Sequence, residues 1–243
     1  MTIEIGQIKA IFRYPVKSMA GEQLDTASLG WHGLDGDRRF AFRRIADQGG
    51  FPWLTASRLP ELILFRRFRS DLGSDNQSPT HIRTPEGDIL ELRSEELRAE
   101  IARRHGAEVE LMQLNRGIFD EASVSLITLA TILQIEKEAS QNLDIRRFRP
   151  NLLIETCRNE PFEEDDWVGK AMVFGENAEG GAVSITLRDQ RCVMINFDPE
   201  TAQSTPSILK SVVRLNQNNA GVYGTVVGTG SLSIGQKIYL RSL

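Results

Sequence analysis

The chain is poor in the residues that build metal clusters and disulfide networks. Its 243 residues include only two cysteines, Cys157 and Cys192, which lie far apart and form no CxxC pair. Two thiols exclude a four-cysteine zinc site and an iron–sulfur cluster held by four protein thiolates, and they provide no disulfide framework. This cysteine usage is typical of the reducing cytoplasm, which is the location we expect.

Further absences exclude several functional classes. No apolar run approaches the roughly 20 residues that span a bilayer, and the N-terminal segment does not read as a secretion signal, so no membrane association is predicted. A formal net charge of −4 gives no electrostatic reason to expect nucleic acid as a partner. Dinucleotide, P-loop, nucleophile-elbow, HExxH and EF-hand signatures are missing, and the three histidines are scattered. Histidine-based metal binding or general-base catalysis therefore has no support.

The residues that are present predict a mainly β protein with a few α-helices, an α+β fold. Runs of β-branched and aromatic residues between turn residues indicate strands, and apolar residues at helical spacing indicate helices. The predicted strands are residues 3–14, 38–42, 62–68, 81–83, 89–92, 152–155, 171–174, 183–187, 222–227 and 237–240. The predicted helices are residues 94–104, 125–139 and 206–215, and polar residues 71–79 are expected to form a surface loop. A break near residue 117 predicts two β-rich domains, residues 1–116 and 117–243.

Three arginines crowd the entry to a strand that should be buried. Arg146, Arg147 and Arg149 precede Asn151 and the apolar residues 152–154. Charges beside a core strand need a partner, and the planar guanidinium suits bidentate binding of phosphate or carboxylate. The partner is either the acidic segment at residues 163–166 or a bound anion, and the sequence leaves both open.

A second polar group comes from the first half of the chain. A proline turn after the first strand presents Lys17 and Ser18, and Arg38 and Arg39 follow at the start of another strand. Because consecutive strand residues face opposite ways, only one of these two arginines is expected to face a shared pocket. Solvated turns and strand ends have the same composition, so these residues alone do not establish a site.

Cys192 has the setting of a metal ligand or a nucleophile. A lone cysteine is most often a small buried hydrophobe. Here it follows Arg191 just past the strand at residues 183–187, where a turn can direct it toward a pocket. A nearby positive charge favours the thiolate, which is the form that binds metals and attacks electrophiles. Cys157 has no such setting and is interpreted as structural or incidental.

In their order and spacing, these segments resemble the MOSC-domain family with its N-terminal β-barrel domain. The segments that carry the resemblance are YPVKSM (14–19), GLDGDRRF (33–40), LTASRLPEL (54–62), RFRPNLLI (147–154), FEEDDW (162–167) and RCVMINFDPET (191–201). Each motif is weak alone, but together they extend over almost the whole chain. The chain is similar in kind to amidoxime-reducing proteins and to bacterial proteins that detoxify N-hydroxylated bases.

The resemblance implies an N-terminal β-barrel-like domain, a MOSC β-barrel domain and a molybdenum cofactor carried by a pterin dithiolene. The family's cysteine ligand to the metal falls on Cys192, and Asp198 is expected to shape the loop that bears it, so these two residues form the predicted catalytic group. The residues expected to position the cofactor are Lys17, Ser18, Arg38, Ser123, Ser125, Arg147, Arg149, Asn151 and Arg191. Ser123 and Ser125 are included because the family has a hydroxyl at the start of the long helix.

The implied activity is two-electron reduction of N-hydroxylated or N-oxide-type substrates. No cysteine follows Cys192, so the electrons are expected to come from a separate ferredoxin- or flavin-type protein. One alternative is a non-redox carrier of sulfurated cofactor, or of sulfur on Cys192. Another is that the arginines bind a different phosphorylated ligand, such as pyridoxal phosphate, without molybdenum. The chain departs from the family pattern at Met19 and at Ala202, where the DPxTG motif has glycine.

Overall fold

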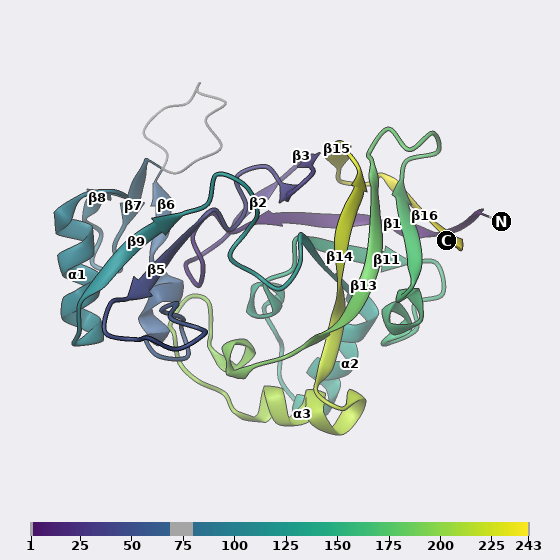
Figure 1. The fold of residues 1–243 in the computed structure, drawn as a ribbon. Coiled ribbons are helices and arrows are strands. Elements are labelled where there is room, and N and C mark those ends of the chain that lie inside the picture. Colours follow the sequence, from purple (N-terminus) through teal and green to yellow (C-terminus); the bar gives the residue numbers. More distant parts are fainter. Residues whose placement is uncertain (1, 69–79, 243) are drawn as a thin grey trace.

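The computed structural model describes residues 2–68 and 80–242, and its main feature is a closed seven-stranded β-barrel (Figure 1). The strands follow the order β11-β10-β14-β13-β12-β16-β1, and pairing of β1 with β11 closes the barrel. Their bounds are β1 (Thr2–Arg13), β10 (Val124–Thr128), β11 (Leu152–Thr156), β12 (Lys170–Phe174), β13 (Ala182–Gln190), β14 (Asn219–Gly228) and β16 (Lys237–Ser242). The expectation of a mainly β fold is confirmed. The predicted surface loop at residues 71–79 lies outside the described residues.

The first strand joins the two halves of the sequence. β1 pairs with β16 on one side and with β11 on the other, so the barrel takes strands from both sides of residue 117. The backbones approach closely at Gly6, where an added Cβ would lie 2.2 Å from the carbonyl oxygen of Glu155. Only glycine fits this contact. The proposed domain boundary near residue 117 stays a prediction.

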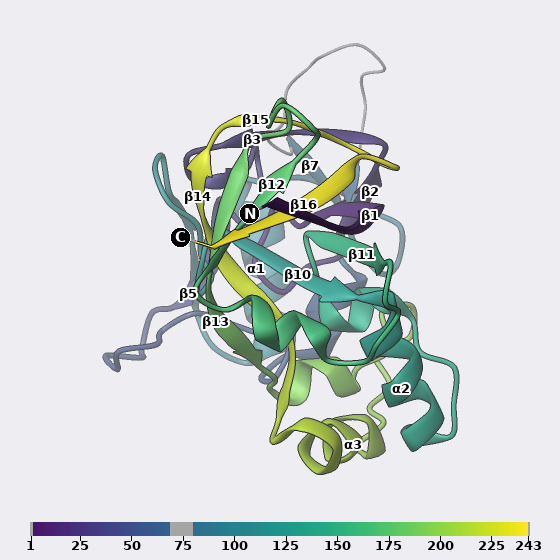
Figure 2. The same cartoon turned by 90° about the vertical axis from the view of Figure 1, so that its right-hand side faces the viewer.

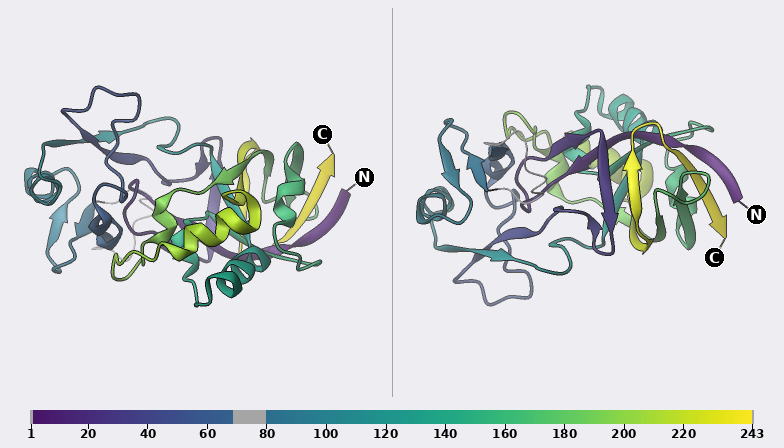
Figure 3. Two further views of the ribbon diagram at one scale, coloured as in Figure 1. Left: turned by 90° about the horizontal axis from the view of Figure 1, so that it is seen from below. Right: turned by 90° about the horizontal axis from the view of Figure 1, so that it is seen from above.

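Two helices cover one side of the barrel, as Figure 2 and the left view of Figure 3 show. α2 (Leu129–Ala139) and α3 (Ser207–Asn216) bury apolar residues such as Ile135 and Val212 against the barrel. The predicted start of the long helix at residue 125 is wrong, because residues 124–128 form β10. All five side chains of β10 are buried, and apolar periodicity does not distinguish such a strand from a buried helix.

A smaller lobe lies beside the barrel, on the left of Figure 1. It contains two small sheets and one helix: β5 (Phe40–Arg44) with β9 (Val109–Gln113), then β6 (Arg66–Phe68), β7 (His81–Arg83), β8 (Ile89–Glu91) and α1 (Glu95–His105). Ser94 caps α1 by accepting a hydrogen bond from the Leu97 amide, and Gly106 ends it at a φ of 77°. The predicted strand at residues 62–68 is partly wrong, because residues 60–64 form a 3₁₀ turn that begins with a proline.

In addition to β9, four short strands were not predicted from the sequence. β2 (Glu22–Leu24) pairs with β1, and β3 (Thr26–Gly30), β4 (Gly33–Leu34) and β15 (Gly230–Ser233) form a separate sheet. Within the described part of the chain, no helix has the length and apolarity that a membrane span requires.

Candidate functional site

A cavity of about 1110 Å³ lies where the lobe meets the barrel. Its walls come from the lobe, from the segment at residues 118–121 and from the end of β13. Seven predicted site residues line it, namely Lys17, Ser18, Arg38, Arg147, Arg149, Arg191 and Cys192. The other four, Ser123, Ser125, Asn151 and Asp198, lie outside its wall. The fold therefore brings together residues that are up to 175 positions apart in the sequence, from Lys17 to Cys192.

Cys192 is an exposed residue of this wall. It stands between the end of β13 and a short 3₁₀ turn, Val193–Asn196, with a φ of −108°. Asn218 fixes the backbone just before it: the Arg191 amide donates to the Asn218 carbonyl, and the Asn218 side-chain amide donates to the Arg191 carbonyl, each over 2.8 Å. Two hydrogen bonds to one residue define the direction in which the cysteine leaves the strand. Cys157 is also exposed but lies outside the cavity wall.

Arg191 is turned into the protein and holds this segment in place. Its guanidinium donates to the carbonyl oxygens of Ala220 over 2.7 Å and Phe148 over 2.8 Å. Its Nη2 lies 2.9 Å from Oδ2 of Asp189, although the two groups are not aligned as a hydrogen bond. Burial raises the pKa of the Asp189 carboxyl to about 7, and Arg191 only partly opposes that shift. Arg191 is therefore mainly a support for the cysteine-bearing segment.

Lys17 and Ser18 bring hydrogen-bond donors to the cavity from the first half of the chain. The Lys17 ammonium donates to the carbonyl oxygen of Phe119 over 2.7 Å, which leaves two of its three N–H donors for a ligand. Burial lowers the pKa of Lys17, and the nearby Asp120 carboxylate opposes this. Ser18 has a φ of 64°, and its hydroxyl makes no hydrogen bond to another described residue.

The guanidinium N–H groups of Arg38 bond to other residues of the protein. Its guanidinium contacts the carboxylates of Asp37 at 2.5 Å and Asp120 at 2.6 Å. It also donates to the carbonyl oxygen of Arg149 over 2.8 Å and to Oδ1 of Asn151 over 3.1 Å. Burial alone would lower the pKa of Arg38, but the two carboxylates raise it, so the side chain stays charged. Arg38 braces the cavity wall, and Arg39 lies outside it. Strand alternation is not the reason, because β5 begins only at Phe40 and Arg38 lies in a turn with a φ of 45°.

Asn151 and Ser125 form the support behind Arg38. Both are buried, and Oδ1 of Asn151 accepts hydrogen bonds from the Ser125 amide over 3.0 Å and from Arg38. The Ser125 hydroxyl donates to the Arg149 carbonyl oxygen and to Oδ1 of Asn151. Ser125 lies in strand β10 and not at the start of the helix. Ser123 is half-buried, and its carbonyl oxygen packs against Gly33. The residue at the actual start of the long helix is Thr128, whose hydroxyl accepts a hydrogen bond from the Thr131 amide.

The sequence leaves open whether the three clustered arginines pair with the acidic segment at residues 163–166 or with a bound anion, and the structure excludes the acidic segment. Arg146 pairs with Asp144 and Glu200, and Arg147 pairs with Asp198. The acidic segment at residues 163–166 is not their partner. It turns instead toward the start of α2, where Glu164 accepts hydrogen bonds from Thr128 and Thr131, and toward Arg188, which pairs with Asp165.

Arg149 lacks a carboxylate partner within the described residues. Its guanidinium donates to the carbonyl oxygen of Met19 over 2.6 Å and lies over the ring of Tyr14, 4.2 Å from the centroid. Burial lowers its pKa to about 10, and the charge of Arg38 adds to that shift. A half-buried guanidinium without an ion pair to the described residues, in a cavity wall, is a candidate for binding an anionic ligand.

Asp198 shapes the loop behind Cys192, as its position in the motif predicts. Its Oδ1 accepts hydrogen bonds from the amides of Glu200 and Thr201, and its Oδ2 lies 2.8 Å from Nη2 of Arg147. Ala202 completes the turn with a left-handed φ of 58°. The catalytic role assigned to Asp198 stays a prediction.

Sequence reasoning missed the aromatic and acidic residues of the cavity. Phe51 and Trp53 come from a loop of the lobe, and Phe119 packs edge-on against Trp53 with ring centroids 4.7 Å apart. Asp120 and Asp189 also line the wall. No motif marks these side chains, because their proximity depends on how the lobe packs against the barrel.

Comparisons with known proteins agree with the resemblance seen in the sequence. Residues 74–239 match the family described as MOSC domain, and residues 5–126 match the MOSC N-terminal beta barrel domain. The chain is 28% identical over 133 residues to mitochondrial amidoxime reducing component 2 of Rattus norvegicus, and 27% identical over 131 residues to mitochondrial amidoxime-reducing component 1 of Danio rerio. Each alignment covers 49% of this chain and 37% of the relative, so the chain matches well under half the length of these curated proteins.

One solved structure has a similar fold. The YuaD protein from Bacillus subtilis superposes with a TM-score of 0.54 and 13% sequence identity, covering 100% of this chain and 98% of that one. At this level of identity the match concerns the fold alone.

Proposed function

The chain belongs to the MOSC domain family, and from this we propose that it binds a molybdenum cofactor through the thiolate of Cys192. The observation that carries the proposal is an exposed cysteine in the wall of a large cavity that also holds the guanidinium of Arg149, which has no carboxylate partner among the described residues. A thiolate suits a soft metal centre, and a cation suits the phosphate of a pterin.

The residues of the cavity fit such a group in size and chemistry. Ligand sites commonly measure about 300–1000 Å³, and a volume of about 1110 Å³ accommodates a pterin with room for a substrate. Among the predicted site residues of the wall, the Lys17 ammonium, the Ser18 hydroxyl and the Arg149 guanidinium keep hydrogen-bonding capacity for a ligand after their bonds to the described residues are counted. Donors with free capacity in one wall are what a phosphate-bearing ligand requires.

The side chains divide into those that contact the cofactor and those that hold the contacting residues. Cys192 is the ligand to the metal, and Lys17 and Arg149 bind the anionic end. Arg38 and Asn151 do not contact the cofactor but hold the residues that do, because their hydrogen bonds join the two sides of the wall. When bound, the cofactor supplies two-electron redox chemistry that no side chain of the cavity offers.

We propose that the reaction is the reduction of N-hydroxylated or N-oxide-type substrates. For an N-hydroxy compound the balance is R–NHOH + 2 e⁻ + 2 H⁺ → R–NH2 + H2O, with the electrons supplied by a separate redox protein of the ferredoxin or flavin type. The names of the amidoxime-reducing relatives support this reaction class. The aromatic faces of Phe51 and Trp53 offer an apolar surface for a planar substrate.

A second candidate function rests on the exposure of Cys192. An exposed thiol beside a cavity also suits a carrier that holds sulfurated cofactor, or sulfur as a persulfide, without reducing a substrate.

Turnover separates the two candidates. The protein is made in a host that synthesises molybdenum cofactor and is assayed for benzamidoxime reduction with a reduced viologen dye as electron donor. The enzyme proposal expects turnover that Cys192→Ala abolishes and Cys157→Ala preserves. Retained cofactor with no turnover favours the carrier.

A further inference from the structure

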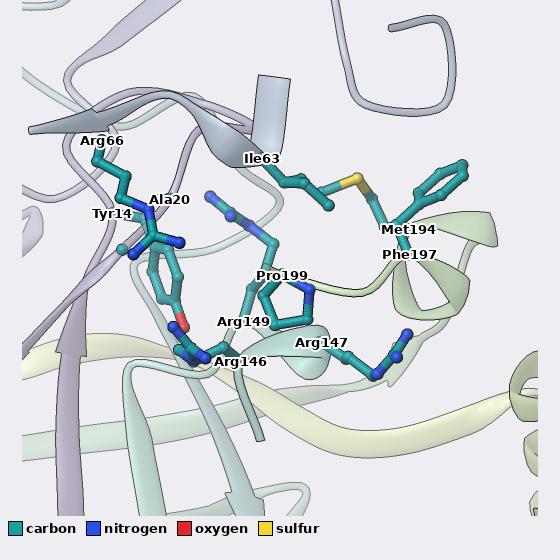
Figure 4. Close-up of a pocket in the computed structure, with 11 residues that line it drawn as sticks. Tyr14, Ala20, Ile63, Arg66, Arg146, Arg147, Arg149, Met194, Phe197 and Pro199 are labelled. Carbon is teal, nitrogen blue, oxygen red and sulfur yellow. The ribbon is translucent and has the colours of Figure 1, made fainter. Parts of the chain in front are cut away.

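A second, smaller cavity of about 40 Å³ lies on the other side of Arg149 and is the subject of Figure 4. Four arginines line it: Arg66 from the lobe, and Arg146, Arg147 and Arg149 from the segment before β11. Arg147 and Arg149 also line the larger cavity, but the proposed cofactor site gives no role to Arg66 and Arg146.

The carboxylates around this cavity do not neutralise all four arginines. Glu200 contacts both Arg66 and Arg146. Asp144 pairs with Arg146, and Asp198 pairs with Arg147. Arg149 has no carboxylate within the described residues, so the wall retains one uncompensated positive charge. A half-buried charge without a carboxylate partner favours an anion as its neighbour.

The hydroxyl of Tyr14 provides a second, independent observation. Tyr14 is 1% exposed, lines the cavity, and has no hydrogen-bond partner for its hydroxyl. Burial raises its pKa to about 12, so the group is a protonated donor at neutral pH. In Figure 4 the hydroxyl points toward the side chain of Arg146. A buried donor without an acceptor costs about 1–3 kcal/mol unless a ligand or water supplies one.

The ring of Tyr14 is held in this orientation. An added Cβ on Gly21 would lie 2.3 Å from its Cε1 atom, so the ring packs directly on the glycine backbone. The Arg149 guanidinium covers the ring at 4.2 Å. Because the ring is clamped in this way, the hydroxyl is not expected to find another partner by rotating.

The remaining wall of the cavity is apolar. Ile63 comes from the lobe, and Met194 and Phe197 come from the turn after Cys192. An apolar wall opposite a cluster of cations lowers the local dielectric and strengthens their attraction for an anion.

We propose that this cavity is a binding site for a small tetrahedral oxyanion of the phosphate or sulfate class. A volume of about 40 Å³ holds roughly three water molecules. One such anion occupies a similar space. The guanidinium groups supply charge-assisted hydrogen bonds, and the Tyr14 hydroxyl donates to one further oxygen. The site shares Arg147, Arg149 and Met194 with the wall of the Cys192 cavity and adds Tyr14, Arg66 and Arg146, so its test does not require the proposed function to hold.

Calorimetric titration of the full chain with inorganic phosphate tests the proposal, in a buffer free of other oxyanions. We expect saturable binding, and Tyr14→Phe should weaken it about tenfold, because one hydrogen bond to a charged ligand is lost. Without phosphate the same variant should be at least as stable as the wild type, since the hydroxyl it removes has no partner. Tyr239→Phe, on strand β16, is the matched control and should change neither property.

Two further variants locate the bound anion. Arg146→Gln should weaken phosphate binding at least tenfold, whereas Arg103→Gln, which breaks an exposed arginine–glutamate pair on α1, should not. Lys17→Gln alters only the larger cavity. Phosphate binding that disappears in Lys17→Gln but survives in Tyr14→Phe and Arg146→Gln would overturn the proposal, as would the absence of binding to the wild type at millimolar phosphate.

Discussion

The guanidinium of Arg38 donates a hydrogen bond to Oδ1 of Asn151 over 3.1 Å, and both side chains are buried. The two residues lie 113 positions apart, one before the lobe and the other at the start of β11. Their contact joins the two segments that carry Lys17 and Arg149. The geometry of the cavity wall therefore depends on a buried polar network rather than on apolar packing alone.

Removal of this guanidinium is expected to destabilise the fold strongly. Arg38→Met leaves the carboxylate of Asp37, which is 0% exposed, without its cation. Breaking a buried ion pair in this way costs about 3–5 kcal/mol. Arg39→Met is the matched control and should cost below about 1.5 kcal/mol, because Arg39 bonds only to carbonyl oxygens. Urea denaturation measures both values, and equal losses would contradict the bracing role.

Stability should depend on pH through Asp189. Burial raises the pKa of its carboxyl to about 7 in the folded protein, against about 4 in an unfolded chain. Between these values the folded state keeps a proton that the unfolded state releases, so the free energy of unfolding falls as the pH rises, and the full penalty is present above about pH 7.

Asp189→Asn should remove this pH dependence. Between about pH 5 and about pH 8, the stability of the wild type should fall relative to the variant by roughly 1–3 kcal/mol. Urea titrations at the two pH values measure the difference, with Asp88→Asn on the exposed turn between β7 and β8 as the control. A constant difference across this range would show that the carboxyl is ionised throughout.

Ala202→Gly should stabilise the protein. Ala202 has a φ of 58°, a conformation that glycine adopts without the steric cost that a Cβ brings. We expect a gain of about 0.5–1 kcal/mol in the free energy of unfolding, measured by thermal or urea denaturation. Ala107→Gly, at an exposed loop position without positive φ, should instead lose a few tenths of a kcal/mol. A loss at both positions would mean that the side chain of Ala202 contributes packing that outweighs its strain.

Local sequence signals predicted the elements whose structure is decided locally. The predicted helix at residues 94–104 differs by one residue at each end from α1, which Ser94 caps. The predicted strands at residues 81–83 and 89–92 agree with β7 and β8 to within one residue. The predicted helix wrongly includes residues 125–128, because a strand buried on both faces has no alternation that distinguishes it from a buried helix.

The sequence motifs indicated which residues belong to the candidate site, but not what each of them does. Lys17, Arg38, Arg149 and Cys192 were found from residue type and order, and the fold places them in one cavity wall. Their individual functions depend on tertiary contacts that spacing does not encode. Arg38 pairs with two carboxylates and Arg191 donates to two backbone carbonyl oxygens, whereas Arg149 has no carboxylate partner within the described residues.

The arginine cluster shows the same limit. The sequence placed the acidic segment at residues 163–166 and a bound anion on equal terms as its partner. The fold turns that segment toward α2 and supplies Asp144, Asp198 and Glu200 instead. Which carboxylates reach a guanidinium is set by how distant loops pack, so this choice needs the three-dimensional structure.

The most direct test of the account is the molybdenum content of purified protein, measured by mass spectrometry of the metal. Wild type, Cys192→Ala and Cys157→Ala are produced in the same cofactor-competent host, and circular dichroism checks that each is folded. We expect stoichiometric molybdenum in the wild type and in Cys157→Ala, and its loss from Cys192→Ala. Molybdenum that remains stoichiometric in folded Cys192→Ala protein would contradict the central claim that this thiolate holds the cofactor.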